Sequence, residues 1–301
     1  MKCWILNKPW NTQGLEDYSI TRFKEQAEKD NVNLEIIDPD EIELVVDRNV
    51  RKGITLRGQE VSLPDVVLPR TGARTTYFSF AVIRHLERLG IPCFNTSAAI
   101  EAVKDKLYTQ QIMAQAGLPI PKTMLAKFPV DVHTVEKQLG FPVVVKPLYG
   151  AQGKGVYLVD DAASLNDMMQ LIEVTDDKAN IIMQNFVSTS RGKDLRVFVV
   201  GGRPVACMMR KNSGDGFKAN YSQGGTVENH EITPEIEWLA TEACRATGLD
   251  IAGVDLLFDE DSHFKICEVN SAPGFKGIES VCEIDIAREI FHFLHIRLGL
   301  V

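Results

Sequence analysis

Two acidic residues on consecutive apolar runs near the C-terminus constrain this chain more than any other feature. The run Ile251–Phe258 carries a single acid, Asp255, and the run Phe264–Val269 carries Glu268, with Asn270 two residues after it. Both runs have the length and apolar character of β-strands, and the short polar segment between them can form a hairpin. Residues i and i+2 of a strand point to the same face. Glu268 and Asn270 therefore face the same way, and the hairpin can set Asp255 beside them.

Three oxygen ligands on one face of a sheet suit a Mg²⁺ ion that is held jointly with substrate phosphates. The alternative is a solvated acid at a strand end, followed by an ordinary turn through Asn270-Ser271-Ala272-Pro273-Gly274. These residues alone leave both interpretations open, so the rest of the chain has to decide between them.

Composition narrows the class of protein. A length of 301 residues allows two or three domains, and 45% hydrophobic with 25% charged residues is typical of a soluble globular protein. The net charge of −8 argues against nonspecific binding of DNA or RNA, which needs a basic surface. No run approaches the ~20 apolar residues of a membrane span. The apolar run at the start is too short for a signal peptide.

The six cysteines are scattered, with no CxxC pair, and most lie in apolar strand or helix patterns. We therefore expect buried free thiols in a reducing cytoplasm and no zinc site.

The first part of the chain predicts an α/β fold. Lys2–Leu6, Ser19–Asp30 and Asn33–Ile37 have the patterns of a strand, a helix and a strand, which indicates a parallel sheet with helices on its faces. Arg70 and Arg74 follow a short apolar strand, at the carboxyl end where such sheets bind ligands. They are candidates for binding an acidic substrate. The alternative is two solvated arginines at a helix start.

Changes of pattern divide the chain into three predicted domains: an N-terminal α/β domain over residues 1–96, a central α+β unit over 97–187 and a C-terminal unit over 188–301 that carries the metal-type residues. In the second unit, a helix is expected over Lys104–Ala116, with Gly117 and two prolines as stop signals. We see no internal repeat.

A glycine-rich loop, Gly150-Ala151-Gln152-Gly153-Lys154-Gly155, lies between two expected strands. It is neither a Walker loop nor a dinucleotide-binding loop, because both of those open a helix. Backbone N–H groups of such a loop can still close over phosphates, although a tight turn is the simpler explanation. Lys146, which ends the preceding apolar strand, and Lys106 are candidate phosphate ligands beside this flap. The alternative for both is a surface lysine.

Further cationic and polar groups lie in or next to the polar segment 211–225: Arg210 precedes it, and Lys218 and Asn220 lie within it. A cluster of cations opposite three metal-type oxygen ligands is the arrangement that phosphoryl transfer needs, because that reaction depends on positioning and on charge neutralisation.

In this order the parts resemble the ATP-grasp superfamily, and more closely its RimK-like (ribosomal-protein α-L-glutamate ligase) family. The resemblance covers nearly the whole chain. It is carried by Asp105-Lys106-Leu107, Val143-Val144-Val145-Lys146, the loop Gly150–Val156, Asp194–Gly201, Phe217-Lys218-Ala219-Asn220, Ala252-Gly253-Val254-Asp255 and Glu268-Val269-Asn270-Ser271-Ala272-Pro273-Gly274. The segment Pro69-Arg70-Thr71-Gly72 is similar to the Pro-Arg-Ile-Gly of that family.

The resemblance implies a fold of three parts in which two α+β domains clasp ATP. It implies phosphate contacts for Lys106 and Lys146, a hinge beside the adenine at Asn185 and Phe186, and a place near the ribose for Asp194. The full set of ATP-binding residues expected in this way is Lys106, Lys146, Gly150, Gln152, Gly153, Gly155, Gln184, Asn185, Phe186, Val187, Asp194, Lys218, Ala219 and Asn220.

The resemblance also implies that Asp255, Glu268 and Asn270 hold two Mg²⁺ ions, with Mn²⁺ as an alternative, and that Arg210 and Asn270 serve the chemical step. Members of the family phosphorylate a carboxylate with ATP, and an amine then displaces the phosphate to give an amide. Such a reaction needs metal-neutralised phosphates and fixed cations but no protein nucleophile.

Two positions depart from the family pattern. The hinge reads Gln184-Asn185-Phe186 where Gln-Glu-Tyr or Gln-Glu-Phe is usual, and Tyr221-Ser222-Gln223-Gly224-Gly225 stands in place of Leu-His-Arg-Gly-Gly. A basic residue at the position of Gln223 can serve the acidic groups of the incoming amino acid. Its absence here leaves open an amine other than glutamate.

The expected function is thus an ATP-dependent carboxylate–amine ligase in the cytoplasm. Its expected partners are ATP, an amino acid and a carboxylate of a peptide, protein or small molecule, and the family suggests a homodimer or homotetramer. The alternatives are a ligase for another amine or a small peptide, and an ATP-binding regulator of the same fold without activity. The complete set of reactive residues favours the enzyme.

Overall fold

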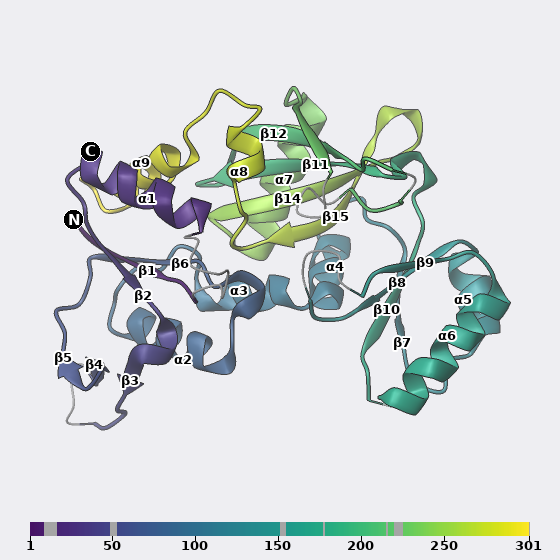
Figure 1. Ribbon diagram of the computed structural model, residues 1–301, viewed down its shortest axis with the longest axis horizontal. Coiled ribbons are helices and arrows are strands. Elements are labelled where there is room, and N and C mark those ends of the chain that lie inside the picture. Colours follow the sequence, from purple (N-terminus) through teal and green to yellow (C-terminus); the bar gives the residue numbers. More distant parts are fainter. Residues whose placement is uncertain are drawn as a thin grey trace.

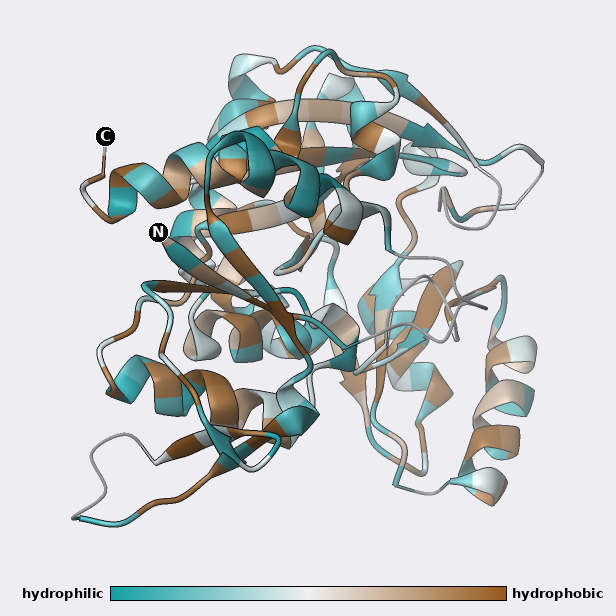
Figure 2. Cartoon of the chain, turned by 60° about the vertical axis from the view of Figure 1, so that its left-hand side comes forward, coloured by the Kyte–Doolittle hydropathy of each residue, from teal (hydrophilic) through white to brown (hydrophobic). Residues whose placement is uncertain are grey.

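The computed structural model describes residues 1–8, 17–48, 53–150, 155–176, 178–214, 216–219 and 225–300. Figure 1 shows three groups of elements, with the N-terminal segments on one side, the central segments on the other and the C-terminal segments above both. The two chain ends lie on the same side of the molecule in Figures 1 and 2.

The N-terminal part is built on a parallel sheet, as the sequence predicts. Its strands run in the order β2-β1-β6, and β1 pairs in parallel with both neighbours. The elements of this part are β1 (Lys2–Leu6), α1 (Tyr18–Lys29), β2 (Asn33–Ile37), β6 (Val66–Pro69) and α2 (Tyr77–Arg88), with a small antiparallel sheet of β3 (Ile42–Leu44), β4 (Ile54–Leu56) and β5 (Gln59–Glu60). Short 3₁₀ turns lie at Pro39–Glu41 and Gly72–Arg74.

The connection to the central part differs from the single helix predicted over 104–116. Helix α3 (Ser97–Lys104) ends and helix α4 (Lys106–Gln115) begins at Asp105. The backbone of Asp105 is extended, at φ −88° and ψ 112°, and its carboxylate accepts a hydrogen bond from the backbone N–H of Tyr108 at 2.9 Å. This is an N-cap, which Asp favours. The break matters because it places Lys106 in the first turn of a new helix.

The central part is an antiparallel sheet with two helices on one face. Strands β7 (Thr123–Ala126), β8 (Val143–Pro147), β9 (Tyr157–Val159) and β10 (Ile181–Asn185) are arranged in the order β7-β10-β8-β9. Helices α5 (Val132–Leu139) and α6 (Ala162–Thr175) pack against this sheet. The residues of this core, among them Val135, Val143 and Leu165, belong to no other buried cluster. The central part is therefore packed independently of the rest.

The C-terminal part is a five-stranded antiparallel sheet in the order β13-β12-β11-β14-β15. Its strands are β11 (Lys193–Val200), β12 (Arg203–Lys211), β13 (Thr226–Asn229), β14 (Ile251–Phe258) and β15 (Phe264–Asn270). Helix α7 (Pro234–Thr247) covers one face together with α3 and α4. The predicted hairpin of β14 and β15 is confirmed. The remaining elements are helices α8 (Lys276–Glu279) and α9 (Ile286–Arg297) and 3₁₀ turns at Ser188–Ser190 and Glu260–Ser262.

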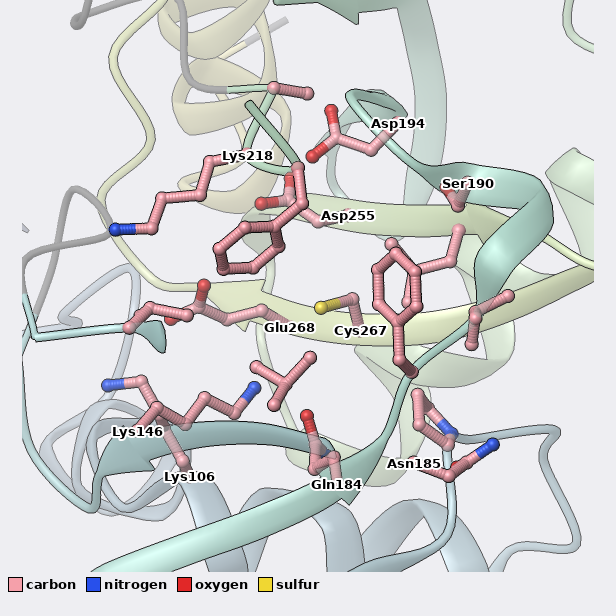
Figure 3. Close-up of a pocket in the computed structure, with 18 of the residues that line it drawn as sticks. Lys106, Lys146, Gln184, Asn185, Ser190, Asp194, Lys218, Asp255, Cys267 and Glu268 are labelled. Atoms are coloured by element: carbon pink, nitrogen blue, oxygen red, sulfur yellow. The ribbon is translucent and has the colours of Figure 1, made fainter. Parts of the chain in front are cut away.

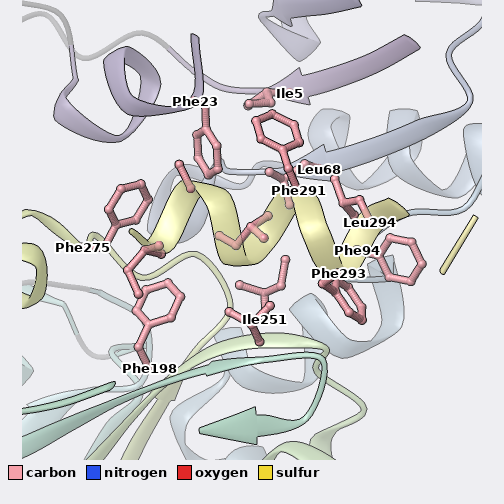
Figure 4. Close-up of a cluster of buried hydrophobic side chains, with 14 of the residues drawn as sticks. Ile5, Phe23, Leu68, Phe94, Phe198, Ile251, Phe275, Phe291, Phe293 and Leu294 are labelled. Atoms are coloured by element: carbon pink, nitrogen blue, oxygen red, sulfur yellow. The ribbon is translucent and has the colours of Figure 1, made fainter. Parts of the chain in front are cut away.

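One buried cluster joins the N-terminal and C-terminal parts. Helix α9 lies between the two sheets, and its residues Phe291 and Leu294 pack with Ile5 and Leu68 on one side and with Ile251 on the other (Figure 4). Apolar side chains in one continuous core resist separation, because each fully buried one contributes roughly 1.5–3 kcal/mol. The first and last parts therefore form one packed body. The domain boundaries at 96 and 187 stay a prediction.

In Figure 2 the hydrophobic colour is concentrated in the sheet strands and on the helix sides that face them. Within the described ranges, none of the helices is both long enough and apolar enough to span a membrane.

Candidate active site

A pocket lies between the central sheet and the C-terminal sheet, and its empty space of about 1000 Å³ is partly open to solvent. The lining comes from both sheets, from the start of α4 and from the segment after β10. It comprises Lys106, Pro121, Val144, Lys146, Pro147, Gly150, Val156, Gln184, Asn185, Phe186, Val187, Ser190, Lys193, Asp194, Arg210, Phe217, Lys218, Ala219, Asp255, Leu257, Cys267 and Glu268.

The floor of the pocket is one face of the C-terminal sheet. Side chains alternate along β11, so that Leu195 and Val197 enter the core under α7 while Asp194 and Arg196 point to the opposite face. Farther along the same face, Phe198 belongs to the core shared with the N-terminal part. The face is thus covered by apolar packing at one end and carries charged groups at the other, and only the charged end borders the pocket.

Strand register sets these charges directly opposite one another. Asp194 of β11 pairs with Arg210 of β12, Arg196 of β11 pairs with Asp255 of β14, and Asp255 pairs with Glu268 of β15. Opposite charges at paired positions attract across a sheet. The sequence placed Asp255 beside Glu268 correctly and named Arg210 as a cation of the site. The structure adds Arg196, which pairs with Asp255.

Two arginines each form a pair of hydrogen bonds to one aspartate. Arg196 donates from Nε and Nη2 to the two oxygens of Asp255 at 2.6 and 2.7 Å, and Arg210 grips Asp194 in the same way at 2.6 and 2.8 Å. Arg210 also reaches Oδ2 of Asp255 at 2.9 Å. Burial alone would raise the pKa of the Asp255 carboxyl, but Arg196 and Arg210 outweigh burial and hold that pKa below its ordinary value. Asp255 is therefore ionised.

A β-bulge near the end of β15 changes which side chains of this strand face the pocket. Asp255 pairs with Glu268, and the next residue, Leu256, pairs with Ile266, so that Cys267 is the extra residue of the bulge. Both Cys267 and Glu268 line the pocket as a result. Burial raises the pKa of the Cys267 thiol to about 11. Strict alternation would have turned Cys267 away, which is why the sequence did not indicate it.

The opposite wall carries two lysines. Lys146 is a buried residue near the end of β8, and Lys106 stands in the first turn of α4 and donates to the carbonyl oxygen of Gly150 at 2.8 Å. Burial lowers the pKa of the Lys106 ammonium; Glu268 opposes this effect and Lys146 adds to it. Figure 3 shows both lysine side chains extending toward Glu268 from the side opposite Asp255 and Asp194.

The segment after β10 forms a third side. Gln184 donates to the hydroxyl of Thr123 at 2.7 Å, and Phe186 meets Phe217 edge to face, with ring centroids 6.3 Å apart. The side-chain oxygen of Asn185 is buried and has no hydrogen-bond partner among the described residues. Aromatic edges with an unpaired amide beside them form a suitable environment for a flat heterocycle.

The mouth of the pocket is bridged by Lys218. Its Nζ lies 5.7 Å from the ring centroid of Tyr157 in the central part and the same distance from that of Phe217 in the C-terminal part. These distances are within cation–π range. Lys218 therefore contacts both packed bodies across the opening.

The described pocket lining does not include every predicted residue. Gln152, Gly153, Asn220 and Gln223 fall outside the described residues. Gly155 and Asn270 are described, but neither lines the pocket. Asn270 lies on the same strand as Glu268, and its Nδ2 donates to the carbonyl oxygen of Gly253 at 3.4 Å.

The two N-terminal arginines are also apart from the pocket lining. Arg70 is buried, with its guanidinium 5.8 and 6.0 Å from the ring centroids of Phe23 and Phe275, and it donates to the carbonyl oxygen of Pro273. Arg74 donates to the carbonyl oxygen of Lys8. Whether either binds a substrate stays a prediction.

The donor set fits a hard cation better than zinc. Within the described part of the chain, no three His, Cys, Asp or Glu side chains are grouped so that they could hold a metal ion by themselves. Asp255 and Glu268 bring carboxylate oxygens to the pocket, and Asn270, which is not part of the lining, has an amide oxygen on the same strand as Glu268. Mg²⁺ is usually bound by one or two carboxylates with waters and substrate phosphates completing the shell. The residues present therefore fit Mg²⁺ shared with a phosphate.

Comparison with known proteins assigns this three-part fold, with its pocket between the central and C-terminal sheets, to the ATP-grasp enzymes of the ligase class. Residues 103–294 match the RimK-like ATP-grasp domain and residues 1–100 match the RimK PreATP-grasp domain. The chain belongs to the RimK-like ATP-grasp family, as its motifs predicted.

Two curated relatives illustrate the similarity. The chain is 36% identical over 278 residues to the probable alpha-L-glutamate ligase of Hydrogenovibrio crunogenus, a match that covers 92% of this chain and 91% of the relative. It is 34% identical over 285 residues to probable alpha-L-glutamate ligase 1 of Shewanella amazonensis, with 94% and 93% covered.

Solved structures share the fold at lower identity. The ATP-grasp ligase PsnB, solved with a phosphomimetic variant of its minimal precursor, Mg and ADP, superposes with a TM-score of 0.75 at 18% identity, covering 98% of both chains. D-alanine–D-alanine ligase from Bacillus anthracis gives a TM-score of 0.70 at 17% identity, covering 99% of this chain and 97% of that one. At these identities the likeness supports the fold alone.

Proposed function

We propose that this protein is an ATP-dependent carboxylate–amine ligase that joins glutamate, or a similar amino acid, to a carboxylate of a peptide, a protein or a small molecule. The observation that carries the proposal is the pair of opposed walls: two lysines face two carboxylates across one pocket. Cations and a metal site on opposite sides are suited to hold a polyphosphate between them. The names of the curated relatives support glutamate.

The proposed reaction has two steps. A carboxylate oxygen of the acceptor attacks the γ-phosphorus of ATP, the bond to the bridging oxygen breaks, and ADP and an acyl phosphate form. The amine nitrogen then attacks the acyl carbon, phosphate leaves and the amine loses a proton, which gives the amide. Neither step needs a nucleophile from the protein, so binding and charge neutralisation are what the residues have to supply.

In this scheme Lys106 and Lys146 bind phosphate oxygens, and Arg210 steadies the phosphoryl group. Arg210 keeps an unassigned Nη1 for that role, because its printed bonds to Asp194 and Asp255 use only Nε and Nη2. The other proposed ATP contacts are Gly150, Gln152, Gly153, Gly155, Gln184, Asn185, Phe186, Val187, Asp194, Lys218, Ala219 and Asn220.

Asp255, Glu268 and Asn270 would hold Mg²⁺, with two ions proposed and Mn²⁺ as a substitute. When bound, the ions neutralise the phosphate charge and polarise the phosphoryl group. Asn270 would also serve the chemical step. Arg70, Arg74 and Gln223 are proposed to meet the acceptor and the amine. A cytoplasmic location and a homodimer or homotetramer remain part of the proposal.

The test is a screen for ADP release with purified protein, ATP and Mg²⁺, across amino acids combined with peptide, protein and small-molecule carboxylates. We expect ADP, phosphate and a new amide with at least one pair. Glu268→Gln, which removes a metal-binding charge, should nearly abolish turnover while the fold stays intact. If no pair releases ADP although the protein binds ATP, the regulator of the same fold replaces the ligase. A gain in glutamate use by Gln223→Arg would support the role of that position.

A further inference from the structure

Arg196 has no role in the proposed chemistry, yet it is the closest cation to Asp255. The two residues face each other in register on β11 and β14, and Arg196 occupies one position on each carboxylate oxygen, at 2.6 and 2.7 Å. Its side chain is largely buried, at 16% exposure, against 7% for that of Asp255. A bidentate guanidinium–carboxylate pair fixes the plane of both groups.

The hydrogen bonds limit what Asp255 can offer. A carboxylate has about four lone-pair positions, two on each oxygen. On Oδ2, Arg196 takes one position and Arg210 takes the other at 2.9 Å. On Oδ1, Arg196 takes one position. One lone pair on Oδ1 is left, so Asp255 can give a single bond to a single metal ion and cannot chelate it with both oxygens.

The backbone beside Asp255 leaves room for this arrangement. Gly253 lies two residues before Asp255 on the same face of β14. A Cβ at that position would stand 3.3 Å from Cδ of Arg196 and 2.7 Å from Cβ of Pro273. Pro273 therefore leaves no room for a Cβ at this position, and the stem of Arg196 packs close beside the same glycine.

We propose that Arg196 is a positioning residue that orients Asp255 as a one-oxygen metal ligand. The inference rests on the proposed function, because it assigns Arg196 to the same metal site. Arg196 acts through Asp255, and its own guanidinium faces the carboxylate. Groups that orient metal ligands through hydrogen bonds typically change metal affinity about 10- to 100-fold when they are removed.

The positive charge of Arg196 and its orienting effect on Asp255 should change metal affinity in opposite directions, so the test has to separate the two. A cation beside Asp255 repels a metal ion, and its loss by itself would tighten metal binding. Arg196→Lys keeps the charge and loses the planar fork. If the planar guanidinium orients Asp255, this variant should bind metal more weakly. If only the charge matters, its metal affinity should not change.

The experiment is a titration of Mn²⁺ into protein with ADP, followed by the electron paramagnetic resonance signal of free Mn²⁺, so that no turnover is required. We expect Arg196→Lys to bind Mn²⁺ about 10- to 100-fold more weakly than the wild type. Binding of ADP without metal should not change. The matched control is Arg84→Lys, which alters an exposed pair with Glu101, 2.8 Å long and away from the pocket.

The possible results distinguish a positioning role from a charge effect, from a loss of the pocket and from the absence of a metal site. Arg196→Lys with wild-type Mn²⁺ affinity overturns the positioning role, and so does Arg196→Gln with tighter binding than wild type. Weaker metal binding by Arg196→Lys together with weaker metal-free ADP binding would indicate a general loss of the pocket and would also overturn it. If the wild-type protein with ADP binds no Mn²⁺, the proposed metal site itself fails, which is distinguishable because the control then fails as well.

Discussion

The side chain of Asn95 donates from Nδ2 to the carbonyl oxygen of Ser271 at 2.8 Å, across 176 positions of sequence. The same nitrogen donates to the carbonyl oxygen of Ile251, and Oδ1 accepts from the backbone N–H groups of Asp250 and Ile251 at 2.8 and 2.9 Å. Asn95 is 1% exposed. One buried side chain of the N-terminal part thus satisfies backbone groups at the start of β14 and just after the end of β15.

Asn95→Ala should destabilise the protein strongly. The change removes four hydrogen bonds to backbone groups, two of them buried and two partly buried. A buried group left without a partner costs about 1–3 kcal/mol. We expect a loss of about 3 kcal/mol or more in the free energy of unfolding, measured by urea denaturation. The control is Asn33→Ala at an exposed strand end. A loss below about 1 kcal/mol would show that water or local rearrangement replaces these bonds.

Arg70 makes the second link to the same segment, through its bond to the carbonyl oxygen of Pro273 at 2.6 Å. Burial lowers the pKa of Arg70 to about 10, and its Nη1 is buried without a partner among the described residues. Because a poorly paired buried charge is itself costly, removing it offsets part of the lost hydrogen bond.

Arg70→Met should therefore cost less than Asn95→Ala, below about 2 kcal/mol in the free energy of unfolding by urea denaturation. If Nη1 receives the acid group of the acceptor, as proposed, the KM for the acceptor rises while the KM for ATP stays unchanged. An unchanged acceptor KM would remove Arg70 from the substrate site and leave it the role of joining two parts of the fold.

Tyr18, which lies away from the pocket, should make the stability of the protein depend on pH above 10. Its hydroxyl donates to Glu279 at 2.7 Å, and burial, followed by the bond to this carboxylate and its charge, raises the pKa of Tyr18 from 10.0 to about 12. The folded state therefore favours the protonated phenol. Its contribution to stability is complete below pH 10 and is lost as the pH rises toward 12.

Tyr18→Phe should lower stability at neutral pH and reduce the loss of stability between pH 10 and 12. The measurement is the difference in the free energy of unfolding between wild type and variant as the pH increases, which cancels other groups that titrate in this range. The difference should shrink above pH 10. A constant difference up to pH 12 would mean that the phenol has the same pKa in both states.

The sequence predicted the face of each strand better than the contacts between strands. Period-two alternation placed Glu268 and Asn270 together, and the short hairpin brought Asp255 beside Glu268. Arg196 and Asp255 are 59 residues apart, on strands that the hairpin does not join. Their pairing depends on the register of a sheet assembled over that distance, and local pattern does not define such a register.

Local backbone breaks were also missed. The helix predicted over 104–116 divides at Asp105, since an aspartate can cap a new helix although the apolar pattern continues. The bulge at Cys267 was missed for a similar reason: an extra residue interrupts alternation without a change in composition. Both breaks act on the site, because one positions Lys106 and the other exposes Cys267 to the pocket.

Gly253→Ala tests how tightly the face of β14 that carries Asp255 is packed. The new Cβ would lie 2.7 Å from Cβ of Pro273 and 3.3 Å from Cδ of Arg196, so at least one of these neighbours has to move. Overpacking of this kind typically costs about 1–3 kcal/mol. Since Arg196 holds Asp255, we expect the shift to weaken Mn²⁺ binding in the presence of ADP and to lower kcat more than tenfold. Metal-free ADP binding should persist, which separates a displaced ligand from a collapsed pocket. Near-normal turnover in a variant that has lost stability would show that Pro273 yields and that Arg196 keeps its place.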